Sequence, residues 1–229
     1  SFFHSCLKNL GIAQMATAQY SSAEQNFLKA QTYAPRHSLN DYIVRYYRTL
    51  NAFHSGNYTL AQELYLKNKN CKFTAIKDQF AIMQAYLCFL TYTGYLPFNG
   101  PFRIGKYLNE TFKQQTHKQG DNINILIAEL LIYLARNRGR FIDRVEAVKN
   151  YSYRHLKGKA TQRAKWLIRI LCMLPRVDFN VIALQKAAQK QIEQLRNNPL
   201  AMGGNFALEI IPYEALLAMI FKHLEQKVA

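Results

Sequence analysis

The sequence contains no long apolar run. No stretch reaches the roughly 18 residues that a membrane-spanning helix requires, because charged or polar residues interrupt each candidate. Low-complexity segments are also absent. In a signal peptide a basic residue precedes the apolar core, whereas Lys8 lies within an apolar pattern, so no signal peptide is predicted. With 49% hydrophobic and 19% charged residues, the composition is typical neither of disordered nor of membrane proteins. A chain of 229 residues can bury a sizeable core.

Motifs that carry catalysis or phosphate binding are also missing. The chain has no H-E-x-x-H, G-x-x-x-x-G-K-[ST], G-x-G-x-x-G or G-x-S-x-G. Its six His have no convergent set of ligand residues around them, so no metal site is predicted. Asp143 and Glu146 are three residues apart, but Arg140, Arg144 and Lys149 surround them, which favours a solvated ion-pair network over an acid–base pair. We therefore expect a non-enzyme without cofactors.

The four cysteines are too few and too scattered for a disulfide framework. Cys6, Cys71, Cys88 and Cys172 form no C-x-x-C pair and have no His at metal-binding spacing. Most of them lie among apolar residues of expected helices, which favours buried free thiols. Free thiols are typical of a reducing compartment, so the expected location is the cytoplasm.

One stretch near the N-terminus carries a recognisable pattern over residues 7–35. Small, aromatic and apolar residues follow a fixed spacing at Leu7, Leu10, Gly11, Ala23, Phe27, Ala30 and Pro35. This spacing resembles one tetratricopeptide (TPR) repeat, with Leu7 in the place of the usual Trp and Gln14 in the place of the usual Tyr. A second copy follows, in which Tyr58, Ala61 and Tyr65 repeat the spacing of the first.

Later copies keep the period better than the motif. An aromatic residue expected at the start of each second helix recurs at intervals of 38, 44, 39 and 38 residues, at Tyr20, Tyr58, Phe102, Phe141 and Phe179. The resemblance, of a bacterial TPR-like type, implies an all-α fold: a right-handed α-α superhelix of about five helical hairpins and a C-terminal capping helix in one domain, 1–229. The expected hairpins and cap are 2–35, 38–70, 74–115, 122–156, 160–196 and 205–227. Because the chain opens almost directly inside a helical pattern, we expect it to be the C-terminal part of a longer protein.

Several helix boundaries can be predicted from capping residues. Ser21 and Glu24 have the spacing of a capping box at the start of the second helix. Asp178 is expected to cap a single helix over 179–196. The segment 118–121 is expected to be a polar connection, and 102–114 is expected to be a helix that pairs with the one before it.

In TPR arrays the first helix of each hairpin lines a concave groove that reads peptides, so the resemblance implies a groove here. Its implied residues are Lys8, Asn9, Met15, Tyr46, Phe53, Glu129, Tyr133 and Arg136. Lys8 and Asn9 resemble one element of a clamp for a peptide carboxylate, but the matching residues of the second repeat are absent. An apolar stripe at this spacing is also typical of a helix core, and both interpretations stay open.

The formal net charge of +16 predicts attraction to polyanions, acidic proteins or anionic membrane surfaces. Between residues 136 and 169 eleven Lys and Arg stand against two acids, with Tyr151, Tyr153 and Trp166 interleaved. The candidate polyanion-binding residues are Arg138, Arg140, Arg144, Arg154, Lys157, Lys159, Arg163 and Lys165. The same cations could form a solvated rim. The favoured function is a non-catalytic protein- or peptide-interaction or regulatory scaffold; the alternative is a nucleic-acid-associated protein that uses this basic segment.

Overall fold

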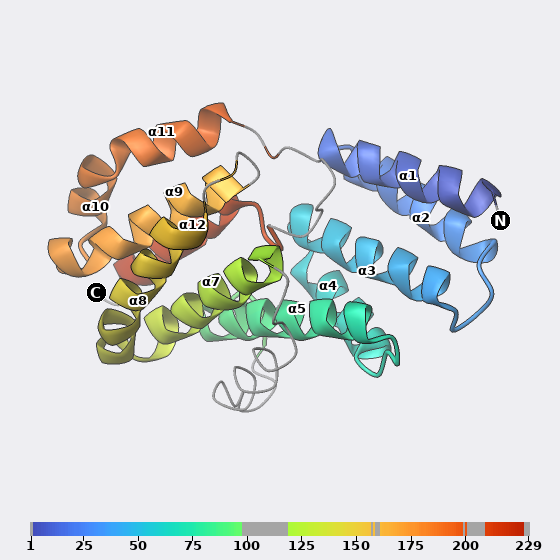
Figure 1. Ribbon diagram of the computed structural model, residues 1–229, viewed down its shortest axis with the longest axis horizontal. Helices are drawn as coiled ribbons and strands as arrows, with labels where there is room; N and C mark the ends of the chain where they lie inside the picture. Colours follow the sequence, from blue (N-terminus) through green and yellow to red (C-terminus); the bar gives the residue numbers. More distant parts are fainter. Residues whose placement is uncertain are drawn as a thin grey trace. The chain divides into compact units, whose positions relative to one another are not determined.

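The computed structural model describes residues 2–97, 119–156, 158, 161–198, 200 and 209–226. Within these ranges the chain forms eleven α-helices and one short 3-10 helix and no strand, which confirms the all-α prediction (Figure 1). Among the helices in these ranges, none is long and apolar enough to cross a membrane. The predicted helix over 102–114 lies outside the described residues.

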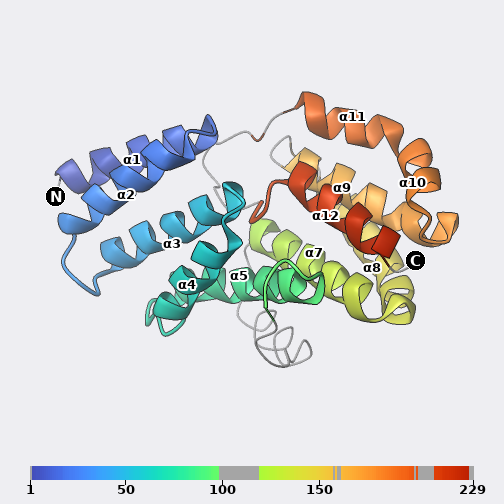
Figure 2. The ribbon, with the colours of Figure 1, turned by 180° about the vertical axis from the view of Figure 1, so that it is seen from behind.

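The chain divides into two compact units, Ser1–Leu87 and Cys88–Ala229, and the division falls inside α5 (Thr74–Tyr92). The first unit also contains α1 (Phe2–Ala16), α2 (Tyr20–Thr32), α3 (Leu39–His54) and α4 (Tyr58–Asn68). Consecutive helices pack against each other: α1 on α2, α2 on α3, and α3 on α4 (Figures 1 and 2). Helices α2 and α4 begin at Tyr20 and Tyr58, the aromatic residues predicted to start them.

Small residues let α1 and α2 approach closely. A Cβ atom on Gly11 would lie 2.7 Å from Cε1 of Phe27, so only glycine fits opposite that ring. Phe27 is fully buried, as are Ala23 and Ala30 on the same face of α2. Leu10 departs from the pattern, because 48% of it is exposed. The close pairing of the first two helices therefore depends on Gly11 and two alanines.

The predicted capping box at the start of α2 is wrong. The helix begins at Tyr20, and no side chain caps it at the preceding Gln19. Ser21 is consequently already the second helical residue. The carboxylate of Glu24 is engaged elsewhere: its Oε1 accepts hydrogen bonds from Nε and Nη2 of Arg48 on α3, at 2.9 and 2.6 Å. An ion pair between neighbouring helices thus replaces a local cap.

The described part of the second unit contains the other helices: α7 (Gln119–Arg136), α8 (Arg138–His155), α9 (Gln162–Met173), the 3-10 helix η2 (Leu174–Val177), α10 (Val181–Ala187), α11 (Gln189–Asn197) and α12 (Tyr213–Gln226). Here α7 packs on α8, α8 on α9, and α11 returns onto α9. The last helix contacts α9, α10 and α11, which lie around it in Figure 2. Helix α9 is thus the element that the most neighbours share.

Two helix starts in this unit lie earlier than predicted. Helix α7 begins at Gln119, so most of the predicted connection over 118–121 is helical. Helix α8 begins at Arg138, because the side chain of Asn137 caps it by accepting a hydrogen bond from the N–H of Arg140 at 3.0 Å. Phe141 is therefore the fourth residue of its helix and not the first.

The predicted cap at Asp178 is also wrong. Asp178 and Phe179 both have positive φ, 49° and 58°, which places them in a left-handed turn before the helix. Asn180 is the actual cap, since its side chain accepts a hydrogen bond from the N–H of Ala183 at 2.9 Å. The predicted single helix is two helices, α10 and α11, that meet at Ala188.

Candidate anion-binding site

A hollow of about 410 Å³ lies between α8 and α9 in the second unit. Its volume falls within the roughly 300–1,000 Å³ typical of small-molecule sites. Ten residues of α8, α9 and η2 line it: Lys149, Asn150, Ser152, Tyr153, Lys165, Ile168, Arg169, Cys172, Met173 and Arg176.

Helical spacing brings these side chains together. On α8, Lys149 and Tyr153 are four residues apart and therefore lie on one face. On α9, lining residues recur at intervals of three or four from Lys165 through Arg169 to Met173, and η2 extends the same stripe to Arg176. Because α8 and α9 pack side by side (Figure 1), the two stripes face one hollow.

The hollow is strongly basic. Lys149, Lys165, Arg169 and Arg176 line it, and none of the lining residues is acidic. Lys149 forms an ion pair with Glu146, with 2.8 Å between Nζ and Oε1, but both side chains are largely exposed, so this pair contributes little. Among the residues that the structure describes, the other three cations form no ion pair. Their charge is thus available to an anionic ligand.

The remaining lining is apolar or aromatic. Ile168 is 1% exposed, whereas Tyr153 is 78% exposed although it lines the hollow with the cations. Burial raises the pKa of Cys172 to about 11, against the opposing charge of Lys149. The thiol therefore stays protonated at neutral pH, which makes it a poor nucleophile. The chemistry that this set of side chains supports is anion binding with ring stacking.

Those of the predicted polyanion-binding residues that the structure describes do not form one surface. Arg140 and Arg154 are exposed on α8. The guanidinium of Arg138 is half-buried and stacks over the ring of Phe179, 4.8 Å from its centre. The Nε of Arg144 donates to Oε2 of Glu129 at 2.9 Å. Lys165 lines the hollow, and Lys157 and Lys159 lie outside the described residues.

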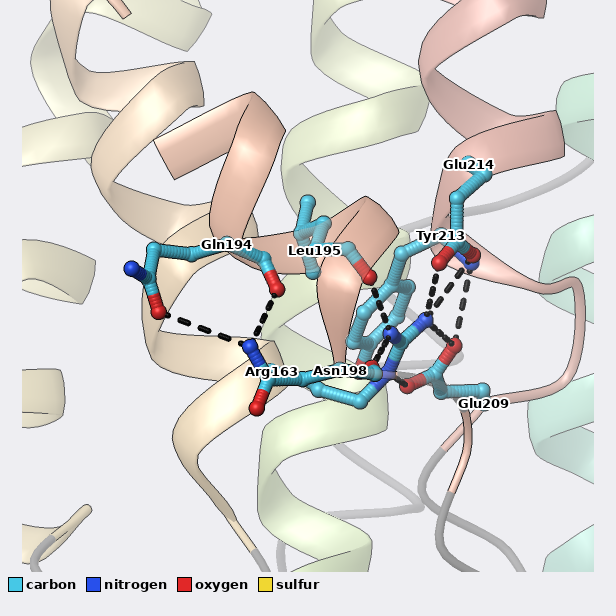
Figure 3. A network of polar contacts seen from close by, with 7 residues as sticks. All are labelled: Arg163, Gln194, Leu195, Asn198, Glu209, Tyr213 and Glu214. Carbon is cyan, nitrogen blue, oxygen red and sulfur yellow. Dashed lines mark hydrogen bonds and ion pairs between the residues drawn. The ribbon is translucent and has the colours of Figure 1, made fainter. Parts of the chain in front are cut away.

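Arg163, also predicted to bind polyanions, is instead a buried structural residue (Figure 3). Its Nε and Nη2 donate to the two carboxylate oxygens of Glu209, at 2.6 and 3.1 Å, and Nη2 also donates to Glu214. Its Nη1 donates to the backbone oxygens of Leu195, at 2.7 Å, and Asn198. All the N–H groups of the guanidinium thus have acceptors inside the protein. The reason for the error is that the acids that neutralise Arg163 are more than 45 residues away in sequence.

The pKa values of Arg163 and Glu209 depend on burial and on the charges of their partners in this network. Burial alone would lower the pKa of Arg163, but the carboxylates of Glu209 and Glu214 raise it above its usual value. Burial raises the pKa of Glu209, and the hydrogen bonds and charge of Arg163 oppose that rise. The ion pairs tie α9 to α12 and to the segment before it, and the two backbone oxygens tie α9 to the end of α11.

Half of the predicted groove residues are buried. Met15, Tyr46, Phe53 and Glu129 are each at most 5% exposed, so they offer a ligand almost no surface. Lys8 is half-buried and Asn9 exposed on α1, while Tyr133 is half-buried on α7. Arg136 is exposed and donates to the hydroxyl of Tyr92 at 3.2 Å.

Glu129 and Tyr133 do share a shallow depression with residues of α8. It has a volume of about 250 Å³ and is also lined by Arg140, Asp143 and Arg144. Burial raises the pKa of Glu129, although the hydrogen bond from Arg144 opposes the rise. With two acids and two arginines, this depression carries no excess charge that would attract an anion.

Lys149 and Arg169 belong to the basic segment but are not among the predicted binding residues, and Arg176 lies outside that segment. A helical signal was present, because Lys165, Arg169 and Arg176 lie at positions i, i+4 and i+11 of one continuous stripe. Pro175 hides that signal in the sequence, because a proline normally ends a helical pattern, whereas here it lies inside the 3-10 helix η2 that extends the stripe.

Comparisons of the chain with protein-family models, curated proteins and solved structures find no match. In the described part of the chain, no group of three or more His, Cys, Asp or Glu is placed to hold a metal ion. The function of the hollow must therefore be inferred from its own geometry and charge.

Proposed function

We propose that this protein is a non-catalytic, TPR-like interaction scaffold that binds an anionic partner in the hollow between α8 and α9. The observation that carries the proposal is the set of four cations in a lining without acids. Three of these cations form no ion pair with a described residue, so a ligand gains their attraction without displacing a protein carboxylate.

The packing of the first unit supports the TPR-like part of the proposal. The residues at the repeat's small and aromatic positions, Ala23, Phe27 and Ala30, are fully buried, and Gly11 lies against the Phe27 ring. In the second hairpin Ala61 is likewise fully buried. On this basis we propose a right-handed superhelix of about five hairpins closed by a capping helix, working in the cytoplasm as a regulatory or interaction module.

A second candidate function is association with nucleic acid through the basic segment 136–169. The specific observation in its favour is the exposed ring of Tyr153 among the cations, since stacking on aromatic rings and phosphate neutralisation are the two means by which proteins bind single strands. An acidic protein segment would form ion pairs with the cations but would have no planar base to stack on the Tyr153 ring.

A binding titration over a salt series tests the proposal. The probes are a polyglutamate peptide and a single-stranded oligoadenylate, measured by fluorescence anisotropy with the full chain. Four cation contacts predict that log K falls with log [salt] with a slope of about −3 for the single strand, so affinity drops by roughly 60-fold between 50 and 200 mM.

The variant Arg169→Glu/Arg176→Glu should abolish binding of both probes. The matched control is Arg140→Glu/Arg154→Glu, which reverses two exposed arginines of α8 that do not line the hollow. Equal losses in the two variants would show that only net charge matters. If neither probe binds at low salt, anion binding is refuted. Preference for the oligoadenylate over polyglutamate at equal charge favours the nucleic-acid function.

A further inference from the structure

We infer that the α8–α9 hollow recognises a nucleotide unit, meaning a planar base that carries phosphate groups. The inference rests on the proposed function, because it assigns the ligand class of the same anion-binding hollow. It is based on three properties of the lining: a carboxylate-free set of cations, one exposed aromatic ring, and a half-buried apolar side chain.

The cations are suited to phosphate. Arg169 and Arg176 are both exposed and lie seven residues apart on one stripe, and a guanidinium can donate two parallel hydrogen bonds to one phosphate. Lys149 reaches the hollow from the opposite helix, so positive charge comes from both walls. A ligand with two or more negative charges close together gains from all of them at once, whereas a single carboxylate engages only part of the set.

The ring of Tyr153 is suited to a planar base. It is 78% exposed although it lines the hollow, and it forms no ring pair with another described aromatic residue. The half-buried side chain of Met173 adds apolar surface to the lining. Stacking between a base and an aromatic ring is sequence-tolerant, because every base has a π-face.

A peptide fits this lining less well. An extended peptide needs partners for its backbone N–H and C=O groups. The only carboxamide and the only aliphatic hydroxyl among the described lining residues belong to Asn150 and Ser152, and Ser152 is 4% exposed. A volume of about 410 Å³ also corresponds to a compact ligand and not to an extended strand of several residues.

The test compares ADP with inorganic pyrophosphate by isothermal titration calorimetry on the full chain. The two probes share a diphosphate, so their affinity ratio isolates the contribution of the nucleoside. We expect ADP to bind about tenfold more tightly than pyrophosphate, as stacking on one ring provides. Tyr153→Ala should remove that preference while leaving pyrophosphate affinity within twofold, and Tyr153→Phe should retain it.

The cation variants separate this inference from the proposed function. Arg169→Gln/Arg176→Gln should weaken both probes at least tenfold, and the control Arg140→Gln/Arg154→Gln should change them less than twofold. If polyglutamate and oligoadenylate bind through the hollow but ADP and pyrophosphate bind equally, the proposed function stands and the nucleotide inference is overturned. Unchanged ADP affinity in Tyr153→Ala overturns it as well.

The nucleotide could be free or part of a single strand, and the oligoadenylate distinguishes these sources. If it binds no better than ADP, the ligand is a free nucleotide. If it binds more than tenfold better and its extra affinity is lost in Tyr153→Ala, the nucleotide belongs to a strand. Tyr153, Arg169 and Arg176 are all exposed, so these substitutions should leave the fold intact, which circular dichroism can verify.

Discussion

The sharpest prediction from the structure concerns the buried guanidinium of Arg163. Replacing it by Met keeps most of the side-chain volume but leaves the Glu209 carboxylate, 2% exposed, without its partner. Removing one member of a buried ion pair costs about 3–5 kcal/mol, because the remaining charge stays desolvated. The backbone oxygens of Leu195 and Asn198 lose their donor as well. We therefore expect Arg163→Met to lower the free energy of unfolding of the second unit by about 3–5 kcal/mol.

The effect should depend on pH. Burial raises the pKa of Glu209, and Arg163 opposes that rise, so the pKa increases further once Arg163 is removed. A carboxylate with a raised pKa in the folded state binds a proton more readily there than in the unfolded chain. The folded state therefore loses stability as the pH rises above the carboxylate's unfolded pKa. The deficit of Arg163→Met relative to the natural chain should be larger at pH 8 than at pH 5.

Urea unfolding monitored by tryptophan fluorescence provides the assay. Trp166, the single tryptophan, lies on α9 three residues after Arg163 and reports on the second unit. The control Arg169→Met, exposed on the same helix, should change stability by no more than about 0.5 kcal/mol. Adding Glu209→Met to Arg163→Met should recover at least half of the loss, because no unpaired charge then remains buried at that position. A loss below about 1 kcal/mol at pH 8, or a deficit that grows as the pH falls, would refute the reasoning.

Two further substitutions test local features of the fold. Gly11→Ala places a Cβ atom 2.7 Å from the Phe27 ring and should cost about 1–3 kcal/mol, seen as a lower Tm of the first unit, whereas an unchanged Tm would contradict the close approach of α1 and α2. Asn180→Ala removes the cap of α10 and should cost about 1 kcal/mol in urea unfolding. Ser21→Ala should stay within about 0.5 kcal/mol, since Ser21 caps nothing, and a larger loss there would restore the capping box.

Local signals in the sequence predicted the first unit well. Helix α3 lies within the predicted hairpin 38–70, and local residues determine its ends, since Ser38 caps its start and Gly56 adopts φ of 75° in the turn that follows it. The second helix of that hairpin, α4, begins at Tyr58, the aromatic residue predicted to start it. These boundaries depend on residues within one turn of the helix end, so they can be predicted from the local sequence.

Boundaries in the second unit depend on less regular geometry. The entry to α10 uses two consecutive left-handed residues, Asp178 and Phe179, and neither is a glycine. Sequence patterns seldom predict this conformation for an aromatic residue, because it is strained. The surrounding packing compensates: Phe179 is 5% exposed and its ring contacts Phe141 and Arg138. Tertiary contacts, which sequence periodicity does not contain, thus determine where α10 begins.

The same distinction applies to the basic segment. A count of charges over residues 136–169 treats all cations of the segment alike. In the fold, some of the described cations lie beside a carboxylate and others do not. Glu129 forms an ion pair with Arg144, and Glu209 and Glu214 form ion pairs with Arg163, so the charges of these two arginines are neutralised within the protein.

The cations of the hollow retain their charge for the opposite reason, since no described acid lies within ion-pair distance of Lys165, Arg169 or Arg176. A protein with fourteen acids for thirty cations cannot neutralise every basic side chain. A carboxylate stabilises the fold most when it lies next to a buried arginine, because an unpaired buried charge costs several kcal/mol. Next to an exposed arginine it contributes little. Binding capacity therefore remains where the acids are absent, and the position of Glu209, more than the number of arginines, determines which part of α9 can bind an anion.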